Sequence, residues 1–254
     1  MSENIWKTAI TDIGPGKIRI KGYNIADIME NLSYAEAVYL ILKGELPSKA
    51  EAALMNAILV SSVDHGASPP SVLGTRTVAS GGNSLNAAIA GGVLVIGDSH
   101  GGAIEQSAKI MQEWVKKGDS PQKAASGLVD WLKETKKRMP GFGHRLHKTD
   151  PRTAKLFEIA ARHGYSGKHI ELCKAIEKAL AEKTGKALPI NVDGAIAAVI
   201  SDMGFDWRLG KGFFIISRVP GLLAHAYEEM TRERPMRKLG PMPFEYDGPP
   251  DREI

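Results

Sequence analysis

The sequence is poor in cysteine and in aromatic residues. Cys173 is the only cysteine among 254 residues, so no internal disulfide can form, which fits a reducing, cytoplasmic environment. Its apolar helical neighbours favour a place in the core over a role as a nucleophile. Aromatic residues make up only 6% of the chain, whereas alanine, leucine and isoleucine are plentiful. This balance favours packed helices over a β-sandwich.

Long apolar runs and several site motifs are missing as well. The longest apolar run, residues 87–96, is too short to cross a bilayer, and no charged-then-apolar leader opens the sequence. There is no His-Glu-x-x-His, no cysteine cluster and no Gly-x-x-x-x-Gly-Lys-Ser/Thr. We therefore expect no membrane span and no metal site.

The net charge of +4 is mildly basic and fits small anionic ligands. Binding of nucleic acid would call for a dense block of lysine and arginine with interleaved aromatic residues, and the sequence has none. We therefore expect small-molecule partners and no nucleic acid.

Start and stop signals predict a mostly helical chain, with one short strand or hairpin at residues 16–22. Two capping boxes, each a serine followed three residues later by a glutamate, predict helices over residues 33–42 and 48–61. The segment 86–96 is apolar on nearly every side, so it should be a buried helix. Further helices are predicted over residues 102–117, 168–183, 194–203 and 220–232, and from Pro121 and Pro151 onward, where proline takes the first helical position.

Histidine, aspartate and glycine gather in the loops between these helices, where a scaffold usually presents its chemistry. His100 lies in Gly-Asp-Ser-His-Gly-Gly just before a helix, whose dipole favours the neutral imidazole. A neutral imidazole can donate a hydrogen bond to an enolising carbonyl, although a structural role in a glycine-rich turn stays open. Asp193, in Asn-Val-Asp-Gly, suits either a plain helix N-cap or a carboxylate that exchanges protons in an apolar setting.

A second loop is crowded with cationic side chains. It reads Gly-Phe-Gly-His-Arg-Leu-His-Lys-Thr-Asp-Pro-Arg and holds His144, Arg145, His147, Lys148 and Arg152. Its two glycines let a ligand approach the backbone, and arginine suits bidentate binding of carboxylates. The Gly-x-Gly lacks a third glycine and follows no predicted strand, which argues against a dinucleotide-binding loop. The loop fits anionic ligands, although a purely structural loop stays open.

Arg218 and His65 each allow two interpretations. Arg218 follows Phe-Phe-Ile-Ile-Ser, and a charge among apolar neighbours must be paired or must bind something, so it forms either a salt bridge or a ligand contact. His65, in Val-Asp-His-Gly at a helix end, is equally open. The tail, residues 234–254, is rich in proline and glycine and predicts an extended arm, free or wrapped on a partner subunit.

Taken together and in this order, these segments resemble the citrate synthase superfamily, and the resemblance covers nearly the whole chain. Gly-Phe-Gly-His followed by Asp-Pro-Arg is its most specific signal. The chain is much shorter than members that make citrate, and is similar to a compact branch, stand-alone citryl-CoA lyase and the citrate synthase-like module of ATP-citrate lyase. The matching segments are residues 18–25 and 34–47, Asp64-His65, Ser-His-Gly-Gly at 99–102, the cationic loop, Asn-Val-Asp at 191–193, Ser217-Arg218 and Arg234-Pro235.

The resemblance implies an all-α, citrate synthase-like fold. A large helical domain would comprise residues 1–105 and 205–254, a smaller helical domain residues 106–204, and the active site would lie in the cleft between them. The family also implies a homodimer or higher homo-oligomer in which Arg234 reaches a neighbouring subunit's site.

The resemblance also implies roles for individual residues. The catalytic residues would be His100, His144 and Asp193. The substrate's carboxylates would be held by His65, Arg152, Arg218 and Arg234. The phosphates of coenzyme A would face Lys148, with Arg145 or His147. No metal and no bound cofactor is implied, because the coenzyme A thioester is a substrate.

The implied activity is that of a carbon–carbon lyase, which cleaves citryl-CoA to acetyl-CoA and oxaloacetate in the cytoplasm. One alternative is a small citrate synthase of the tricarboxylic acid cycle, an acyltransferase that joins the same two products and releases coenzyme A. The same catalytic residues serve both directions, and the short chain favours the lyase. A non-catalytic regulatory subunit with the same fold is a further alternative.

Overall fold

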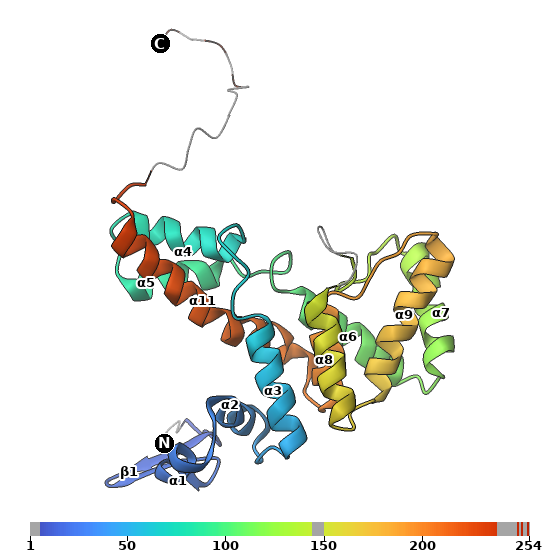
Figure 1. The fold of residues 1–254 in the computed structure, drawn as a ribbon, viewed down its shortest axis with the longest axis horizontal. Helices are drawn as coiled ribbons and strands as arrows, with labels where there is room; N and C mark the ends of the chain where they lie inside the picture. Colours follow the sequence, from blue (N-terminus) through green and yellow to red (C-terminus); the bar gives the residue numbers. More distant parts are fainter. Residues whose placement is uncertain (1–5, 144–149, 238–247, 249, 251–252, 254) are drawn as a thin grey trace, which may run out of the picture.

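The computed structural model describes residues 6–143, 150–237, 248, 250 and 253. Helices dominate this part of the chain, which confirms the predicted mostly helical fold (Figure 1). In the same ranges, no helix is both long and apolar enough to cross a membrane.

A small antiparallel sheet lies near the N-terminus. Its strands follow one another in space as they do in sequence, and Thr11 pairs with Ile20 across the first two. The strand or hairpin predicted at residues 16–22 is confirmed as the middle strand and its turns. Asn24 caps the short helix that follows. These elements are β1 (Thr11–Gly14), β2 (Lys17–Ile20), β3 (Tyr23–Asn24) and α1 (Ile25–Asn31).

The two capping boxes start helices α2 (Tyr34–Lys43) and α3 (Lys49–Ser61), as predicted. In each box the serine side chain accepts a hydrogen bond from the glutamate backbone, and the glutamate side chain accepts one from the serine backbone. Glu51 of the second box also accepts a hydrogen bond of 2.6 Å from the Tyr39 hydroxyl. This contact ties α2 to α3.

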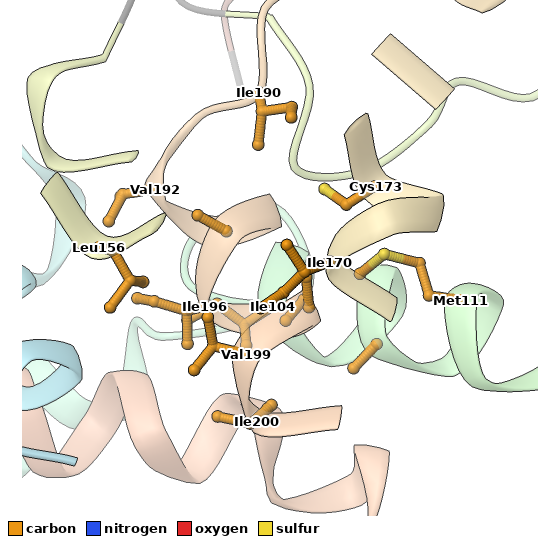
Figure 2. Packing of buried hydrophobic residues seen from close by; sticks show 14 of the residues in the cluster. Ile104, Met111, Leu156, Ile170, Cys173, Ile190, Val192, Ile196, Val199 and Ile200 are labelled. Atoms are coloured by element: carbon orange, nitrogen blue, oxygen red, sulfur yellow. The ribbon is translucent and has the colours of Figure 1, made fainter. Parts of the chain in front are cut away.

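The main core is formed largely by five helices: α6 (Ala103–Val115), α7 (Pro121–Glu134), α8 (Pro151–Arg162), α9 (Lys168–Thr184) and α10 (Val192–Asp202). Helix α10 is buried along most of its length and packs against α6, α8 and α9, whose apolar side chains surround Ile196 and Val199 (Figure 2). Cys173 is fully buried on α9, as predicted. Burial raises the pKa of its thiol, which makes it a poor nucleophile.

The remaining helices are α4 (Pro70–Ser80), α5 (Leu85–Leu94) and α11 (Gly210–Arg232), which the 3₁₀ helix η1 (Trp207–Leu209) precedes. Helices α4 and α5 lie far from α7 and α9 (Figure 1). The first part of α11 joins the main core through Phe213 and Phe214. Its later part packs on α4 and α5, where Ala79, Ala88 and Ala226 form a second small cluster. Helix α11 therefore connects both parts of the molecule.

The sequence predicts a buried helix at residues 86–96, and the predicted burial is wrong. Helix α5 does form there, but only Ala88 and Gly92 are buried, and Leu94 is 85% exposed. The helix turns small residues toward α4, where they allow close approach, and leaves large apolar residues outside. An all-round apolar pattern does not distinguish this arrangement from full burial.

The predicted start of the last helix at Pro220 is also wrong. Helix α11 begins at Gly210 and carries Pro220 inside it. Proline removes one backbone hydrogen bond and often ends a helix, but the buried side chains of Phe213 and Leu222, on either side, pack the helix through this position. Neither α1 nor α4 is predicted from the sequence, since α4 begins at a Pro-Pro pair that is typical of a loop.

The close packing of α5 on α4 yields a test of stability. A Cβ atom on Gly92 would lie 1.9 Å from Thr75 Oγ1 and 2.9 Å from Ser71 O, so Gly92→Ala should lower the free energy of unfolding by about 1–3 kcal/mol. Gly212 is the matched control, because a Cβ there meets nothing within 4 Å. Gly212→Ala should leave stability unchanged or raise it by about 0.5 kcal/mol. Urea denaturation measures both, and equal midpoints for the two variants would contradict the packing.

Candidate active site

A cavity of about 620 Å³ brings together five residues that the sequence singles out. Its volume is typical of small-molecule sites, which span about 300–1,000 Å³. The five come from loops and helices far apart in the sequence. They are His65, His100, Arg152, Asp193 and Arg218.

His100 lies in the loop between α5 and α6, and its Nε2 is held by Ser71. The backbone N–H of Ser71 donates to Nε2 at 3.3 Å, and the Ser71 hydroxyl lies 2.8 Å from the same atom. A nitrogen that accepts from a backbone N–H carries no proton, so the neutral ring carries its proton on Nδ1. Burial and the positive charge of Arg218 hold the pKa of His100 below its usual value. The lowered pKa favours the neutral imidazole, whose hydrogen-bond donor is then Nδ1–H. The role of His100 as a donor to a substrate carbonyl stays a prediction.

The ring of His100 also packs edge-on against Phe214, with centroids 5.6 Å apart. The same Phe214 ring lies 4.7 Å from the guanidinium carbon of Arg218, one turn later on α11. Phe214 thus contacts both the imidazole and the guanidinium along the wall of the cavity.

Arg218 is buried, with only 3% of its surface exposed. Its Nε donates to the backbone carbonyl of Ser62 at 2.9 Å, and its Nη1 has no hydrogen-bond partner among the described residues. A buried donor without a partner is costly unless a ligand satisfies it. This arrangement favours the ligand-contact interpretation of Arg218 over the salt bridge.

Asp193 lies in the first turn of α10 but does not cap it. The cap is Asn191, whose Oδ1 accepts from the backbone N–H groups of Asp193 (3.0 Å) and Gly194 (3.3 Å), so the interpretation of Asp193 as a plain N-cap is wrong. Burial raises the pKa of Asp193, against the opposing positive charges of Arg152 and Arg218. The carboxyl group can therefore hold a proton at a higher pH than an ordinary aspartate.

The start of the cationic loop lies directly on α10. Gly141 accepts a hydrogen bond from Asn191 N (3.1 Å), and Gly143 accepts one from Asn191 Nδ2 (3.0 Å). Gly141 has a φ of +79°, and a Cβ on it would lie 2.6 Å from Gly194 Cα, so both the turn and the contact require glycine. Four of the predicted residues follow this point and lie outside the described residues: His144, Arg145, His147 and Lys148.

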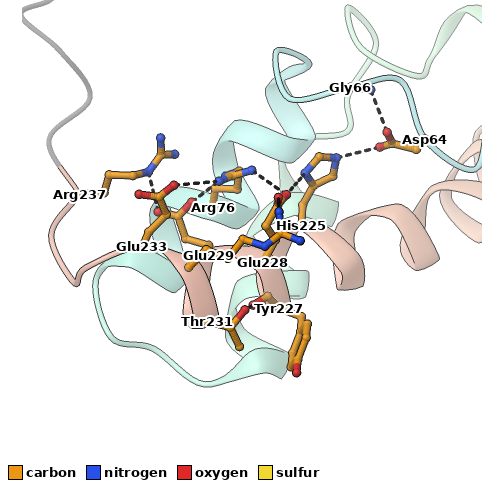
Figure 3. A network of polar contacts seen from close by, with 11 residues as sticks. Asp64, Gly66, Arg76, His225, Tyr227, Glu228, Glu229, Thr231, Glu233 and Arg237 are labelled. Atoms are coloured by element: carbon orange, nitrogen blue, oxygen red, sulfur yellow. Dashed lines mark hydrogen bonds and ion pairs between the residues drawn. The ribbon is translucent and has the colours of Figure 1, made fainter.

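The loop that carries His65 is anchored to α11. His225 Nε2 donates to Asp64 at 3.0 Å, and the other oxygen of Asp64 accepts from Gly66 N at 2.9 Å (Figure 3). This pairing fixes both neighbours of His65 at the edge of the cavity.

Arg234 is exposed just after the end of α11 and does not line this cavity. The chain around it is fixed by Glu229, a buried residue that accepts hydrogen bonds from Arg76 (2.6 Å) and Arg237 (2.7 Å) (Figure 3). Arg237 N also donates to Ser80 Oγ at 2.8 Å. The backbone on either side of Arg234 is thus attached to α4 and α11.

Several residues of the site are not predicted from the sequence. Ser71 acts through its contact with His100, 29 residues away, which no local pattern signals. Asn191 caps α10, a role that an asparagine just before a helix could have indicated. Residues 97–101 also read Gly-x-Ser-x-Gly, the pattern of a nucleophile elbow, but they follow helix α5 rather than a strand. Among the described residues, no group of three or more His, Cys, Asp or Glu side chains could hold a metal ion.

The family model of the citrate synthase C-terminal domain matches residues 2–54 and 48–239. The chain belongs to the citrate synthase family. Citrate synthase 2 of Bacillus subtilis (strain 168) is 30% identical over 234 residues, which are 90% of this chain and 60% of that protein. The probable ATP-citrate synthase of Dictyostelium discoideum is 30% identical over 188 residues, 67% of this chain and 29% of that protein. The chain thus spans less than two thirds of the length of these curated relatives.

Solved structures share the fold over the whole chain. Citryl-CoA lyase from Hydrogenobacter thermophilus is 49% identical, with a TM-score of 0.93 over 99% of this chain and 98% of that chain. ATP citrate lyase from Methanothrix soehngenii, in complex with citrate and coenzyme A, is 20% identical, with a TM-score of 0.86 over 99% of this chain and 43% of that chain. The second likeness shows the fold alone. The predicted citrate synthase-like fold is confirmed.

The charge of Arg218 links two titrating groups of this citrate synthase family member. Because a positive charge favours the neutral imidazole and the ionised carboxylate, Arg218→Gln should raise the pKa of both His100 and Asp193. Arg218→Lys is the control, since it keeps the charge and should leave both pKa values close to wild type. NMR titration of the His100 ring and the Asp193 carboxyl carbon measures the shifts. Identical titration curves for wild type and the glutamine variant would contradict this electrostatic coupling.

Proposed function

We propose that this protein is a citryl-CoA lyase, which cleaves citryl-CoA to acetyl-CoA and oxaloacetate. The observation that carries the proposal is the likeness to the Hydrogenobacter citryl-CoA lyase, which extends over nearly the full length of both chains at 49% identity. The alternative is a small citrate synthase, which the similarity to the Bacillus enzyme supports. This chain, however, spans only 60% of that enzyme. A non-catalytic regulatory subunit would have no need for a cavity that lowers the pKa of His100 and raises the pKa of Asp193.

The proposed reaction breaks the bond between the tertiary carbon of citryl-CoA and the carbon next to the thioester. His144 takes the proton of the tertiary hydroxyl, and the electron pair of that O–H bond forms the carbonyl of oxaloacetate. The pair from the broken carbon–carbon bond becomes an enolate, whose charge develops on the thioester oxygen. His100 stabilises this oxygen with its Nδ1–H, and Asp193 gives its proton to the enolate carbon, which yields acetyl-CoA.

The raised pKa of Asp193 and the lowered pKa of His100 support these roles. Cleavage needs Asp193 in its protonated form, which a raised pKa makes more abundant near neutral pH. A neutral imidazole donor avoids placing a full positive charge beside the developing enolate. The same groups serve citrate synthesis in the opposite direction, where an ionised Asp193 takes the proton instead, so the chemistry alone does not separate lyase from synthase.

The proposed role of most of the cationic residues is to bind the carboxylates of the substrate. Arg152 and Arg218 line the cavity, and the unpartnered Nη1 of Arg218 suits a carboxylate oxygen. His65 and, from a second subunit, Arg234 would complete the carboxylate contacts. Lys148, with Arg145 or His147, would face the phosphates of coenzyme A. In the proposed domain division, residues 106–204 would close over the bound substrate and exclude water.

A second copy of the chain would cover the outer face of α5 and α11. Leu94 is 85% exposed, and Tyr227 and Leu223 on α11 are 66% and 43% exposed. Large apolar side chains on neighbouring helices favour burial against another subunit. Arg234 follows the end of α11, so a dimer formed through this face would bring it toward the partner. We expect such a homo-oligomer in the cytoplasm.

The activity is tested by mixing the purified protein with citryl-CoA and following its products over time. Acetyl-CoA and oxaloacetate should appear together, with little citrate, whereas citrate and free coenzyme A would indicate a synthase. Asp193→Asn and His100→Asn should lower the rate by about 10²–10⁴-fold, since each removes a proton donor or a hydrogen-bond donor to the reacting atoms. His163→Asn, at an exposed position outside the cavity, should keep the wild-type rate. Unchanged turnover after either Asp193→Asn or His100→Asn would refute the mechanism.

A mixing experiment tests whether Arg234 completes the site of a neighbouring subunit. Asp193→Asn and Arg234→Ala enzymes, each inactive alone, should regain activity after subunit exchange, because one site of each mixed dimer is intact. An equal mixture should reach about a quarter of the wild-type rate, as random pairing in a two-fold dimer predicts. The control mixes Asp193→Asn with His100→Asn, two residues of one cavity, and should show no recovery. Recovery in the control alone, or in neither mixture, would contradict the shared site.

A further inference from the structure

Asp150 is a buried carboxylate on which two segments of the cavity converge. It is the N-cap of α8 and has 0% of its surface exposed. Its Oδ1 accepts hydrogen bonds from Arg152 N and Arg152 Nε, both at 3.0 Å. Its Oδ2 accepts from Arg152 Nη2 at 2.9 Å and from Val192 N at 3.1 Å. One side chain thus joins the start of α8 to the start of α10.

The contact with Arg152 fixes the plane of the guanidinium group. Asp150 occupies Nε–H and one N–H of Nη2, which is the bidentate geometry that arginine forms with carboxylates. Arginine carries five N–H donors, so three remain. Arg152 lines the cavity and its side chain is 27% exposed, so N–H groups that Asp150 does not occupy can reach a ligand there.

The contact with Val192 completes the first turn of α10. Asn191 accepts from the backbone N–H groups of Asp193 and Gly194, and Asp150 accepts from that of Val192. All three donors of this turn are therefore satisfied. Because Val192 precedes Asp193, the carboxylate that orients Arg152 also sets the position of the residue that we assign as the proton donor.

Asp150 remains ionised in its buried place. Burial alone would raise the pKa of Asp150, but the hydrogen bonds and charge of Arg152 and the hydrogen bond from Val192 outweigh it and hold the pKa below its usual value. A plain N-cap of α8 would need only the single bond to Arg152 N. The three other hydrogen bonds are directed at residues of the cavity or at the residue beside one.

We propose that Asp150 is a positioning residue for the reaction. It orients the Arg152 guanidinium toward a carboxylate of the substrate and holds the start of α10, so that Asp193 lies at a fixed place relative to that carboxylate. This role rests on the proposed function, since it presumes a substrate that carries a carboxylate and a carbon that receives a proton.

The test is Asp150→Asn, which keeps the size of the side chain and removes its charge. The kcat/KM for citryl-CoA should fall by about 10²-fold, as expected when catalytic groups are displaced by about 1 Å. The affinity for oxaloacetate, measured by calorimetry, should fall as well, because the guanidinium is no longer held. In an Arg152→Gln background the same change should cost much less oxaloacetate affinity, since Asp150 acts on that ligand through Arg152.

The matched control is Asp202→Asn, which removes the carboxylate of the last residue of α10. The side chain of Asp202 is 5% exposed and lies away from the cavity. It accepts hydrogen bonds from the backbone N–H groups of His169 and Ile170, both at 3.0 Å, and so holds the start of α9. The control should lose thermal stability and keep its kcat/KM. If Asp150→Asn behaves like Asp202→Asn, with a lower Tm and normal kinetics, Asp150 is only structural and the proposal is overturned.

Failure of the proposed function would show separately. Wild-type protein that neither cleaves citryl-CoA nor binds oxaloacetate would overturn the function, whatever the variants do. Crystal structures of wild type and of Asp150→Asn then decide the positioning role without a substrate. A turned Arg152 guanidinium and a shifted Val192 in the variant would support it, and unchanged positions of both would overturn it.

Discussion

The packing of α10 is the constraint on which the described site depends. Its apolar residues are buried among α6, α8 and α9, so the helix cannot shift along its axis without disturbing the main core. Its first turn carries Asp193. The backbone of this turn donates hydrogen bonds to Asn191 and Asp150, and the glycines of the cationic loop lie directly beside it. A helix fixed in the core thus determines where the site's acidic group, one of its arginines and the start of its most basic loop lie.

The cavity brings charged groups close together. Arg218 is buried with one nitrogen unpartnered, and Asp193 is held in a setting that disfavours its ionised form. Both features reduce the stability of the empty protein, and a bound anion would offset the first of them. Asp150 shows the opposite solution in the same region, because its charge is fully compensated by four hydrogen bonds. Arg218 and Asp193 thus lack full compensation and suit contact with a ligand, whereas the compensated Asp150 suits a positioning role.

Local signals predict the helices well, and contacts between distant segments explain the rest. Capping boxes and prolines at first helical positions mark α2, α3, α7 and α8, since these signals act within one turn. The exposure of α5 and the passage of α11 through Pro220 depend on packing with other helices. The short motifs identify His65, His100, Arg152, Asp193 and Arg218, which do meet in one cavity. Ser71 and Asp150 gain their roles from partners 29 and 42 residues away, which no local pattern encodes.

The contact between the cationic loop and α10 has an evolutionary consequence. A Cβ on Gly141 would lie 2.6 Å from Gly194 Cα, and a Cβ on Gly194 would lie 2.4 Å from Gly141 O. Neither position can drift to a larger residue while the other backbone stays in place. Substitutions at Gly141 and Gly194 are therefore coupled during evolution. A homologue that replaces either glycine must also change the distance between the loop and α10.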